Sequence, residues 1–93
     1  MSENVHAHII VFGVVQMVGF RYFTSRLADD YGLTGWVRNI PHGKVEIEVE
    51  GQRSLVTDFI KEIRLGPPSA HVTDVDVRWG DYEGRYTDFR VRF

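Results

Sequence analysis

The chain has 93 residues, a formal net charge of −2 and no cysteine. Its length suits one small domain, and hydrophobic residues, 43% of the total, suffice for one packed core. The charge excludes a basic surface for general nucleic-acid or anionic-membrane binding, and the lack of cysteine excludes disulfides and thiolate chemistry. We therefore expect a single domain over residues 1–93, monomeric, with no nucleic-acid or membrane partner. The polar N-terminus carries no secretory pattern, so we expect a cytoplasmic location.

The first half of the chain predicts a strand followed by a helix. Residues 5–14 are apolar on both faces over their middle, which is typical of a central strand. Residues 20–31 have helical spacing, and Gly32 is a natural C-terminal stop. One face of this helix carries Phe20, Phe23, Leu27 and Tyr31.

A hairpin is predicted next. Residues 34–40 form a strand, and Pro41-His42-Gly43 has the residue types of a tight turn. Residues 44–50 then alternate in polarity and predict a second strand that ends at Gly51. Its inward side chains are Val45, Ile47 and Val49, and its water-facing side chains are Lys44, Glu46, Glu48 and Glu50.

The second half predicts one more helix and two strands. Residues 54–65 form an amphipathic helix with Ser54 as the expected N-cap, ended by Gly66-Pro67-Pro68. A strand over 71–79, a polar loop over 80–88 and a short strand over 89–93 follow. The buried stripe of the helix is Val56, Phe59, Ile60 and Ile63.

The order of these elements is β-α-β-β-α-β with one short added strand. Two helices can cover only one face of such a sheet, which predicts an α+β, ferredoxin-like split β-α-β sandwich with both helices on one face of an antiparallel sheet. Right-handed crossovers would make the first and third strands central neighbours.

The segment between the first strand and the first helix, residues 13–21, lacks the usual helix-capping residues. Gly19 is the only candidate cap, and Arg21 places a positive charge in the first turn, where the helix dipole favours anions. A bound anion such as phosphate would satisfy the free N–H groups and the arginine together. The alternative is that Arg21 points into solvent and water binds the amides; these features alone do not decide between the two.

Asn39 is a second candidate, because the predicted strand over 34–40 can end near this loop. Its side-chain amide could hold a water against a bound phosphoryl group. The alternative, which the local pattern alone favours, is ordinary turn chemistry just before Ile40-Pro41-His42-Gly43.

Other kinds of site are less well supported. His6 and His8 share a strand face, but no carboxylate completes a ligand set in sequence, so no metal site is predicted. The segment 18–23 faintly resembles the aromatic motif of RNA-recognition domains, but its aromatics fall at a helix start rather than on a central strand. An RNA-binding module is therefore a poor second interpretation.

Two motifs resemble the acylphosphatase family. The segment Gly13-Val14-Val15-Gln16-Met17-Val18-Gly19-Phe20-Arg21 is similar to the family's Gly-x-Val-Gln-Gly-Val-x-Phe-Arg loop. The segment Gly35-Trp36-Val37-Arg38-Asn39 is similar to its second motif. The resemblance extends over essentially the whole chain and points to the small single-domain form of the family.

The resemblance implies a ferredoxin-like fold and hydrolysis of acyl phosphates to a carboxylate and phosphate, without metal or cofactor. Arg21 would be the catalytic phosphate-binding arginine, and Asn39 the catalytic residue that orients water for in-line attack. The substrate would be a small acyl phosphate whose phosphoryl group lies in a cradle of backbone amides. The cradle residues would be Gln16, Met17, Val18, Gly19, Phe20 and Arg21.

Met17 departs from the family pattern, which has glycine at this position. If the bound loop needs a positive φ there, methionine adds about 1–2 kcal/mol of strain. Confined to the bound form, that strain would weaken phosphate binding by about tenfold. Two alternatives follow: a module that binds phosphate or a small anion without turnover, and an accessory domain that handles carbamoyl phosphate in a larger protein. The end of the chain at Phe93 counts against the second.

Overall fold

The computed structural model describes residues 3–93. All predicted elements occur, and their bounds lie within two residues of those expected. In chain order they are β1 (Asn4–Val14), α1 (Phe20–Tyr31), β2 (Thr34–Ile40), β3 (Lys44–Gln52), α2 (Arg53–Leu65), β4 (His71–Asp81) and β5 (Phe89–Arg92).

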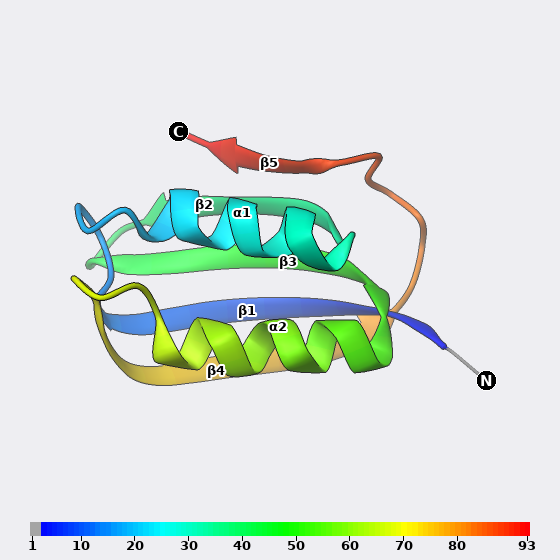
Figure 1. Ribbon diagram of the computed structural model, residues 1–93, viewed down its shortest axis with the longest axis horizontal. Helices are drawn as coiled ribbons and strands as arrows, with labels where there is room; N and C mark the ends of the chain where they lie inside the picture. Colours follow the sequence, from blue (N-terminus) through cyan, green and yellow to red (C-terminus); the bar gives the residue numbers. More distant parts are fainter. Residues whose placement is uncertain (1–2) are drawn as a thin grey trace.

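The strands form one sheet in the order β4-β1-β3-β2-β5, so β1 and β3 are central neighbours, as predicted. The expectation of a purely antiparallel sheet is wrong, because β5 pairs with β2 in parallel. The chain leaves β4 at one edge of the sheet, reverses direction and crosses to the opposite edge (Figure 1). Since β4 and β2 run in opposite directions, a strand that reverses after β4 arrives parallel to β2.

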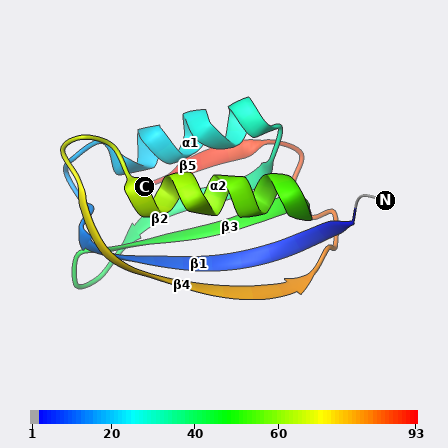
Figure 2. The ribbon, with the colours of Figure 1, turned by 60° about the horizontal axis from the view of Figure 1, so that its bottom comes forward.

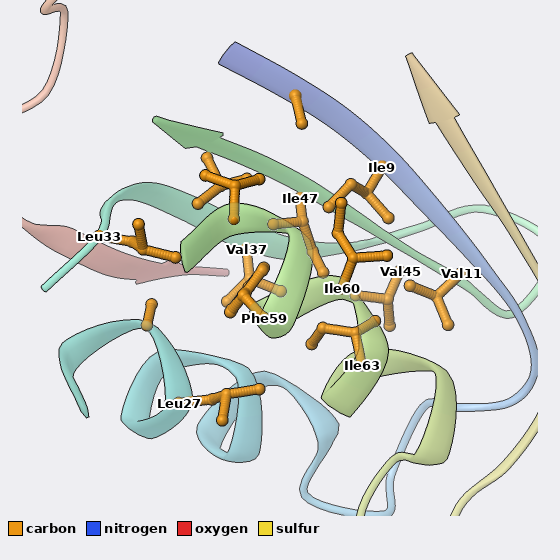
Figure 3. Close-up of a cluster of buried hydrophobic side chains, with 14 of the residues drawn as sticks. Ile9, Val11, Leu27, Leu33, Val37, Val45, Ile47, Phe59, Ile60 and Ile63 are labelled. Atoms are coloured by element: carbon orange, nitrogen blue, oxygen red, sulfur yellow. The ribbon is translucent and has the colours of Figure 1, made fainter. Parts of the chain in front are cut away.

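Both helices lie on one face of the sheet, and the core fills the space between the two layers (Figures 1 and 2). The inward side chains of β1 and β3, such as Ile9 and Ile47, are fully buried there, and the apolar stripe of α2 packs above them (Figure 3). The predicted α2 stripe is confirmed by the burial of Val56, Phe59, Ile60 and Ile63. Within residues 3–93 no helix combines the length and apolar character needed to cross a membrane.

Glu50 corrects the expected exposure of β3. It lies on the outer face of the sheet, as its alternation predicts, but only 1% of it is exposed. Its carboxylate accepts hydrogen bonds from the backbone N–H groups of Glu83 and Arg85, both at 3.0 Å. The segment that crosses from β4 to β5 therefore covers Glu50, and this carboxylate anchors the crossing.

The start of α2 also differs from expectation. The helix begins at Arg53, so the N-cap is Gln52 rather than Ser54, and β3 continues past Gly51 to meet it. Gln52 makes no side-chain capping hydrogen bond. The backbone N–H of Arg53 instead donates to the carbonyl oxygen of Glu3 at 2.8 Å.

Candidate active site

One end of the molecule gathers the segments that the sequence singled out. The connection after β1 (residues 15–19), the end of β2 and the end of β5 lie there, beside the first turn of α1 (Figure 1). The opposite end of the sheet carries the crossing from β4 to β5.

A pocket of about 260 Å³ opens at this end. Arg21 and Asn39 both line it, although they come from α1 and β2. Of the predicted cradle residues, Gln16 and Val18 are not part of its lining. The lining residues are Val15, Met17, Gly19, Phe20, Arg21, Tyr22, Asn39, Val91 and Phe93.

The first turn of α1 has free donors, as the sequence predicts. Gly19 is the N-cap in the left-handed conformation, with φ 76° and ψ 19°, and it has no side chain with which to cap. No acidic residue lies in the first turn. The pocket therefore faces a helix N-terminus whose partial positive charge no protein carboxylate offsets.

Met17 adopts the left-handed backbone conformation that its family position suggested, with φ 63°. Its side chain is 100% exposed, so no packing contact compensates for the conformation. A non-glycine residue in this region costs about 1–2 kcal/mol. The loop is therefore held in a strained shape by the structure around it.

Two residues at the C-terminal end of the chain contact the Arg21 side chain. One Nη donates to the carbonyl oxygen of Arg92 at 3.2 Å, and the guanidinium carbon lies 4.5 Å from the centroid of the Phe93 ring. Among residues 3–93 no carboxylate forms an ion pair with it. The guanidinium therefore has several N–H donors available to the pocket.

Asn39 lies within β2, where it pairs with Val45, and not in the following turn. The positive φ angles of that turn belong to His42 and Gly43. The Oδ1 atom of Asn39 is buried and has no hydrogen-bond partner in the described structure. A buried acceptor without a partner costs about 1–3 kcal/mol, so this geometry favours a site role over turn chemistry.

Gln16 has a role that the sequence reasoning missed. Its side-chain Nε2 donates to the carbonyl oxygens of Ile40 and Lys44, both at 2.8 Å. These bonds tie the loop to the β2–β3 hairpin beside Asn39. The prediction considered only the backbone amide of Gln16, and nothing in the local pattern shows where its side chain reaches.

Four further pocket residues were missed: Val15, Tyr22, Val91 and Phe93. For Val91 and Phe93 the signal was weak, because the placement of β5 next to β2 depends on the crossing from β4. Tyr22 lies one residue beyond the motif that ends at Arg21. Only the apolar spacing of Phe89, Val91 and Phe93 indicated that the last strand has a buried side.

His6 and His8 lie on the outer face of the sheet and do not line the pocket. His6 Nε2 is 3.0 Å from Glu48 Oε1, and His8 Nε2 is 2.8 Å from Glu46 Oε2. Burial raises the pKa of Glu46, but the hydrogen bonds and charges of His8 and Arg38 together lower it more, so this pKa lies below its ordinary value. No group of three or more metal-ligating side chains occurs within residues 3–93.

The RNA-binding interpretation is not supported by the placement of the aromatic residues. Phe20 is buried in α1, and its ring lies 5.8 Å from that of Phe23, which packs against the core. The central strands present the histidine–glutamate pairs on their outer face. Stacking of bases needs exposed aromatic rings on those strands.

Comparison with known proteins identifies the family. The acylphosphatase family model matches residues 7–91. This chain belongs to the acylphosphatase family. The function of this acylphosphatase is the hydrolysis of small acyl phosphates.

Individual relatives match this chain over most of its length. A curated acylphosphatase of Nostoc sp. is 49% identical over 83 residues, which cover 89% of this chain and 82% of that protein. The crystal structure of acylphosphatase from Bacillus subtilis has 37% identity and a TM-score of 0.92, covering 96% and 99% of the two chains. Full-length HypF, solved in a phosphate- and nucleotide-bound form, has 36% identity and a TM-score of 0.89; the match covers 100% of this chain and 12% of HypF.

Proposed function

We propose that Arg21, Asn39 and the backbone amides of residues 16–21 carry out the hydrolysis in this acylphosphatase. The observation that carries this proposal is the buried, unpartnered Oδ1 of Asn39, which lies in the same pocket as Arg21 and the uncapped start of α1. An orphaned acceptor beside a cation and a row of free N–H donors fits a phosphoryl group and its attacking water.

Arg21 and the amides hold the phosphoryl group. The guanidinium binds two phosphoryl oxygens, and the N–H groups of the loop and first turn bind the third. Phosphoryl transfer depends on alignment and on stabilisation of charge at these oxygens, more than on covalent catalysis. The stacked Phe93 ring and the Arg92 carbonyl keep the guanidinium from leaving the pocket.

Asn39 holds the attacking water. Its Oδ1 accepts a hydrogen bond from the water and directs the oxygen lone pair at phosphorus, opposite the leaving carboxylate. An amide is too weak a base to remove the proton, so the proton passes to a phosphoryl oxygen. The P–O bond to the carboxylate breaks, and because a carboxylate leaves readily no strong general acid is needed.

Gln16 positions the two halves of the site. Its two hydrogen bonds to the hairpin fix the distance between the cradle and the strand that carries Asn39. Small errors in such alignment cost large factors in rate. Gln16 is therefore a positioning residue whose side chain does not touch the substrate.

We further propose that residues 1–93 act as one monomeric, cytoplasmic domain that needs no metal or cofactor. The match to full-length HypF, which covers 12% of that chain, supports a second candidate, a domain that acts as part of a larger protein. In this candidate the substrate would be carbamoyl phosphate. A clear preference of this chain for carbamoyl phosphate over acetyl phosphate would support that candidate. The strain at Met17 supports a third candidate function, a module that binds an anion without hydrolysing a substrate.

The test is hydrolysis of benzoyl phosphate, in the presence of a metal chelator, by the wild-type chain and by the Arg21→Ala and Asn39→Ala variants. We expect turnover by the wild type and a loss of at least about 100-fold in kcat/KM in each variant. Phosphate binding without turnover by a folded wild type would favour the binding module. Full activity in either variant would remove the role assigned to that residue.

A further inference from the structure

Three exposed apolar side chains stand around the pocket that holds Arg21. Met17, Tyr22 and Phe93 are 100%, 66% and 99% exposed, and all three line this pocket. Large apolar side chains on a protein surface are usually scattered singly, and a group of them around one cavity marks a place where apolar material binds. The remaining apolar walls are Val15, Phe20 and Val91.

The pocket is larger than the phosphoryl chemistry requires. A phosphoryl group and one attacking water fill roughly half of its 260 Å³, at about 30 Å³ for each water-sized group. Arg21, Asn39 and the loop amides surround that half. The space that remains is bounded by apolar side chains, so the acyl part of the substrate meets a hydrocarbon surface.

The charge of the lining restricts that acyl part further. Within the described residues Arg21 is the only charged side chain that lines the pocket, and the phosphoryl group uses it. If the acyl moiety also carried a negative charge, binding would remove water from that charge. The pocket lining offers it no second cation in exchange, which is unfavourable. An uncharged acyl group meets no such penalty.

We propose that this pocket selects acyl phosphates whose acyl group is apolar and uncharged, an aryl group above all, and that Tyr22 and Phe93 determine this specificity. The proposal rests on the proposed function, because it assumes that Arg21 holds the phosphoryl group. Phe93 stacks on the Arg21 guanidinium and Tyr22 lines the same pocket, so both rings border the space that remains for the acyl group.

The test compares kcat/KM for benzoyl phosphate and acetyl phosphate, which share the same phosphoryl group. Phe93→Ala and Tyr22→Ala should each lower the benzoyl-to-acetyl ratio by about five- to tenfold, because the lost apolar contact serves only the larger acyl group. Any effect through Arg21 acts on both substrates and cancels in the ratio. An unchanged ratio in both variants would overturn the proposal.

Leu65→Ala is the matched control. Leu65 is also a large exposed side chain, 75% exposed, but it lies outside the pocket lining, so its variant should keep the wild-type ratio. Arg21→Ala distinguishes failure of the specificity proposal from failure of the proposed function. If it lowers both rates while the Phe93 and Tyr22 variants keep the ratio, only the specificity proposal fails; if it lowers neither rate, the proposed function fails as well.

Binding of phosphonates gives a readout that does not depend on turnover. Phenylphosphonate should bind the wild-type chain about tenfold more tightly than methylphosphonate, and Phe93→Ala should remove most of that difference. Phosphonoacetate, whose extra group is charged, should bind no more tightly than methylphosphonate. Equal binding of the phenyl and methyl compounds to the wild type would contradict the proposal.

Discussion

The two helices of this protein both begin without a side-chain cap, but the surroundings of their first turns differ. Neither α1 nor α2 has a side-chain cap or an acidic residue in its first turn. Each instead carries an arginine there, Arg21 in α1 and Arg53 in α2. Both helices thus place a positive charge where the helix dipole disfavours it.

In α2 the chain itself supplies the missing partner. Glu3 accepts the backbone N–H of Arg53 through its carbonyl oxygen at 2.8 Å and the Arg53 side chain through its carboxylate at 2.7 Å. A single residue therefore satisfies a free donor and neutralises the arginine. The contacts at the start of α2 therefore have a structural role.

In α1 no such partner is found within the described chain. Gly19 contributes no side chain, Arg21 meets only a carbonyl oxygen and an aromatic ring, and the acceptor of Asn39 is unpaired beside them. We propose that an uncapped, positively charged helix start forms an anion site only where neighbouring residues leave its donors facing a pocket.

Removing each arginine is the strongest way to separate the two helix starts. Arg21→Ala should lower kcat/KM on benzoyl phosphate by about 10³-fold, because it deletes the cation that stabilises the phosphoryl oxygens. Arg53→Ala should change kcat/KM by less than about twofold and cost less than about 1 kcal/mol of stability, because its ion pair is largely exposed. Comparable losses of activity in both variants would contradict the distinction.

Gln16 tests whether the α1 site depends on its tie to the hairpin. Gln16→Leu removes two hydrogen bonds and should lower the free energy of unfolding by about 1–3 kcal/mol. It should also lower kcat about tenfold with a smaller change in KM, because the water and the phosphoryl group lose their alignment. Denaturant unfolding and steady-state kinetics measure both; reduced stability with full activity would make Gln16 purely structural.

Met17 tests how strain in the loop affects the α1 site. Met17→Gly should raise kcat/KM by about two- to tenfold, because without the strain the loop leaves the left-handed conformation seen in the structure less often. Its gain in stability should stay below about 1 kcal/mol, since glycine also loosens the unfolded chain. Asparagine tolerates positive φ, so Met17→Asn should act in the same direction, whereas Met17→Leu should resemble the wild type. Equal kinetics in all four proteins would disprove the strain argument.

The smallest effect is expected where α2 is given a cap. Gln52→Asp places a carboxylate at the N-cap and should raise the free energy of unfolding by about 1 kcal/mol. Activity should stay within about twofold of the wild type, because this helix start lies at the other end of the sheet (Figure 1). A large change in kcat/KM would mean that the two ends are coupled.

The sequence predicted most of the fold because its periodicities are strong. The α2 stripe and the alternation of β3 each specify one buried face, and Gly32 and Gly66 mark where the helices end. The error at Glu50 has a physical reason. Alternation shows which face a side chain occupies, but not that a segment more than 30 residues later, from Glu83 to Arg85, will cover that face.

The candidate site was predicted only in part, for a similar reason. Arg21 and Asn39 belong to motifs and to strand and helix ends that the topology brings together. The side-chain bonds of Gln16 and the position of Phe93 depend on tertiary contacts between distant segments. Local pattern does not encode such contacts, and the part of the pocket lined by Phe93 could therefore not be predicted.

The most direct test of the central claim is a phosphate titration followed by backbone amide NMR on the ¹⁵N-labelled chain. We expect saturable shifts at the amides of residues 16–21 and at the Asn39 side chain, with none at the Arg53 amide that Glu3 already satisfies. The shifts should disappear in Arg21→Ala. Absence of shifts at residues 16–21, or equal shifts at the start of α2, would contradict the claim that α1 alone presents an open anion site.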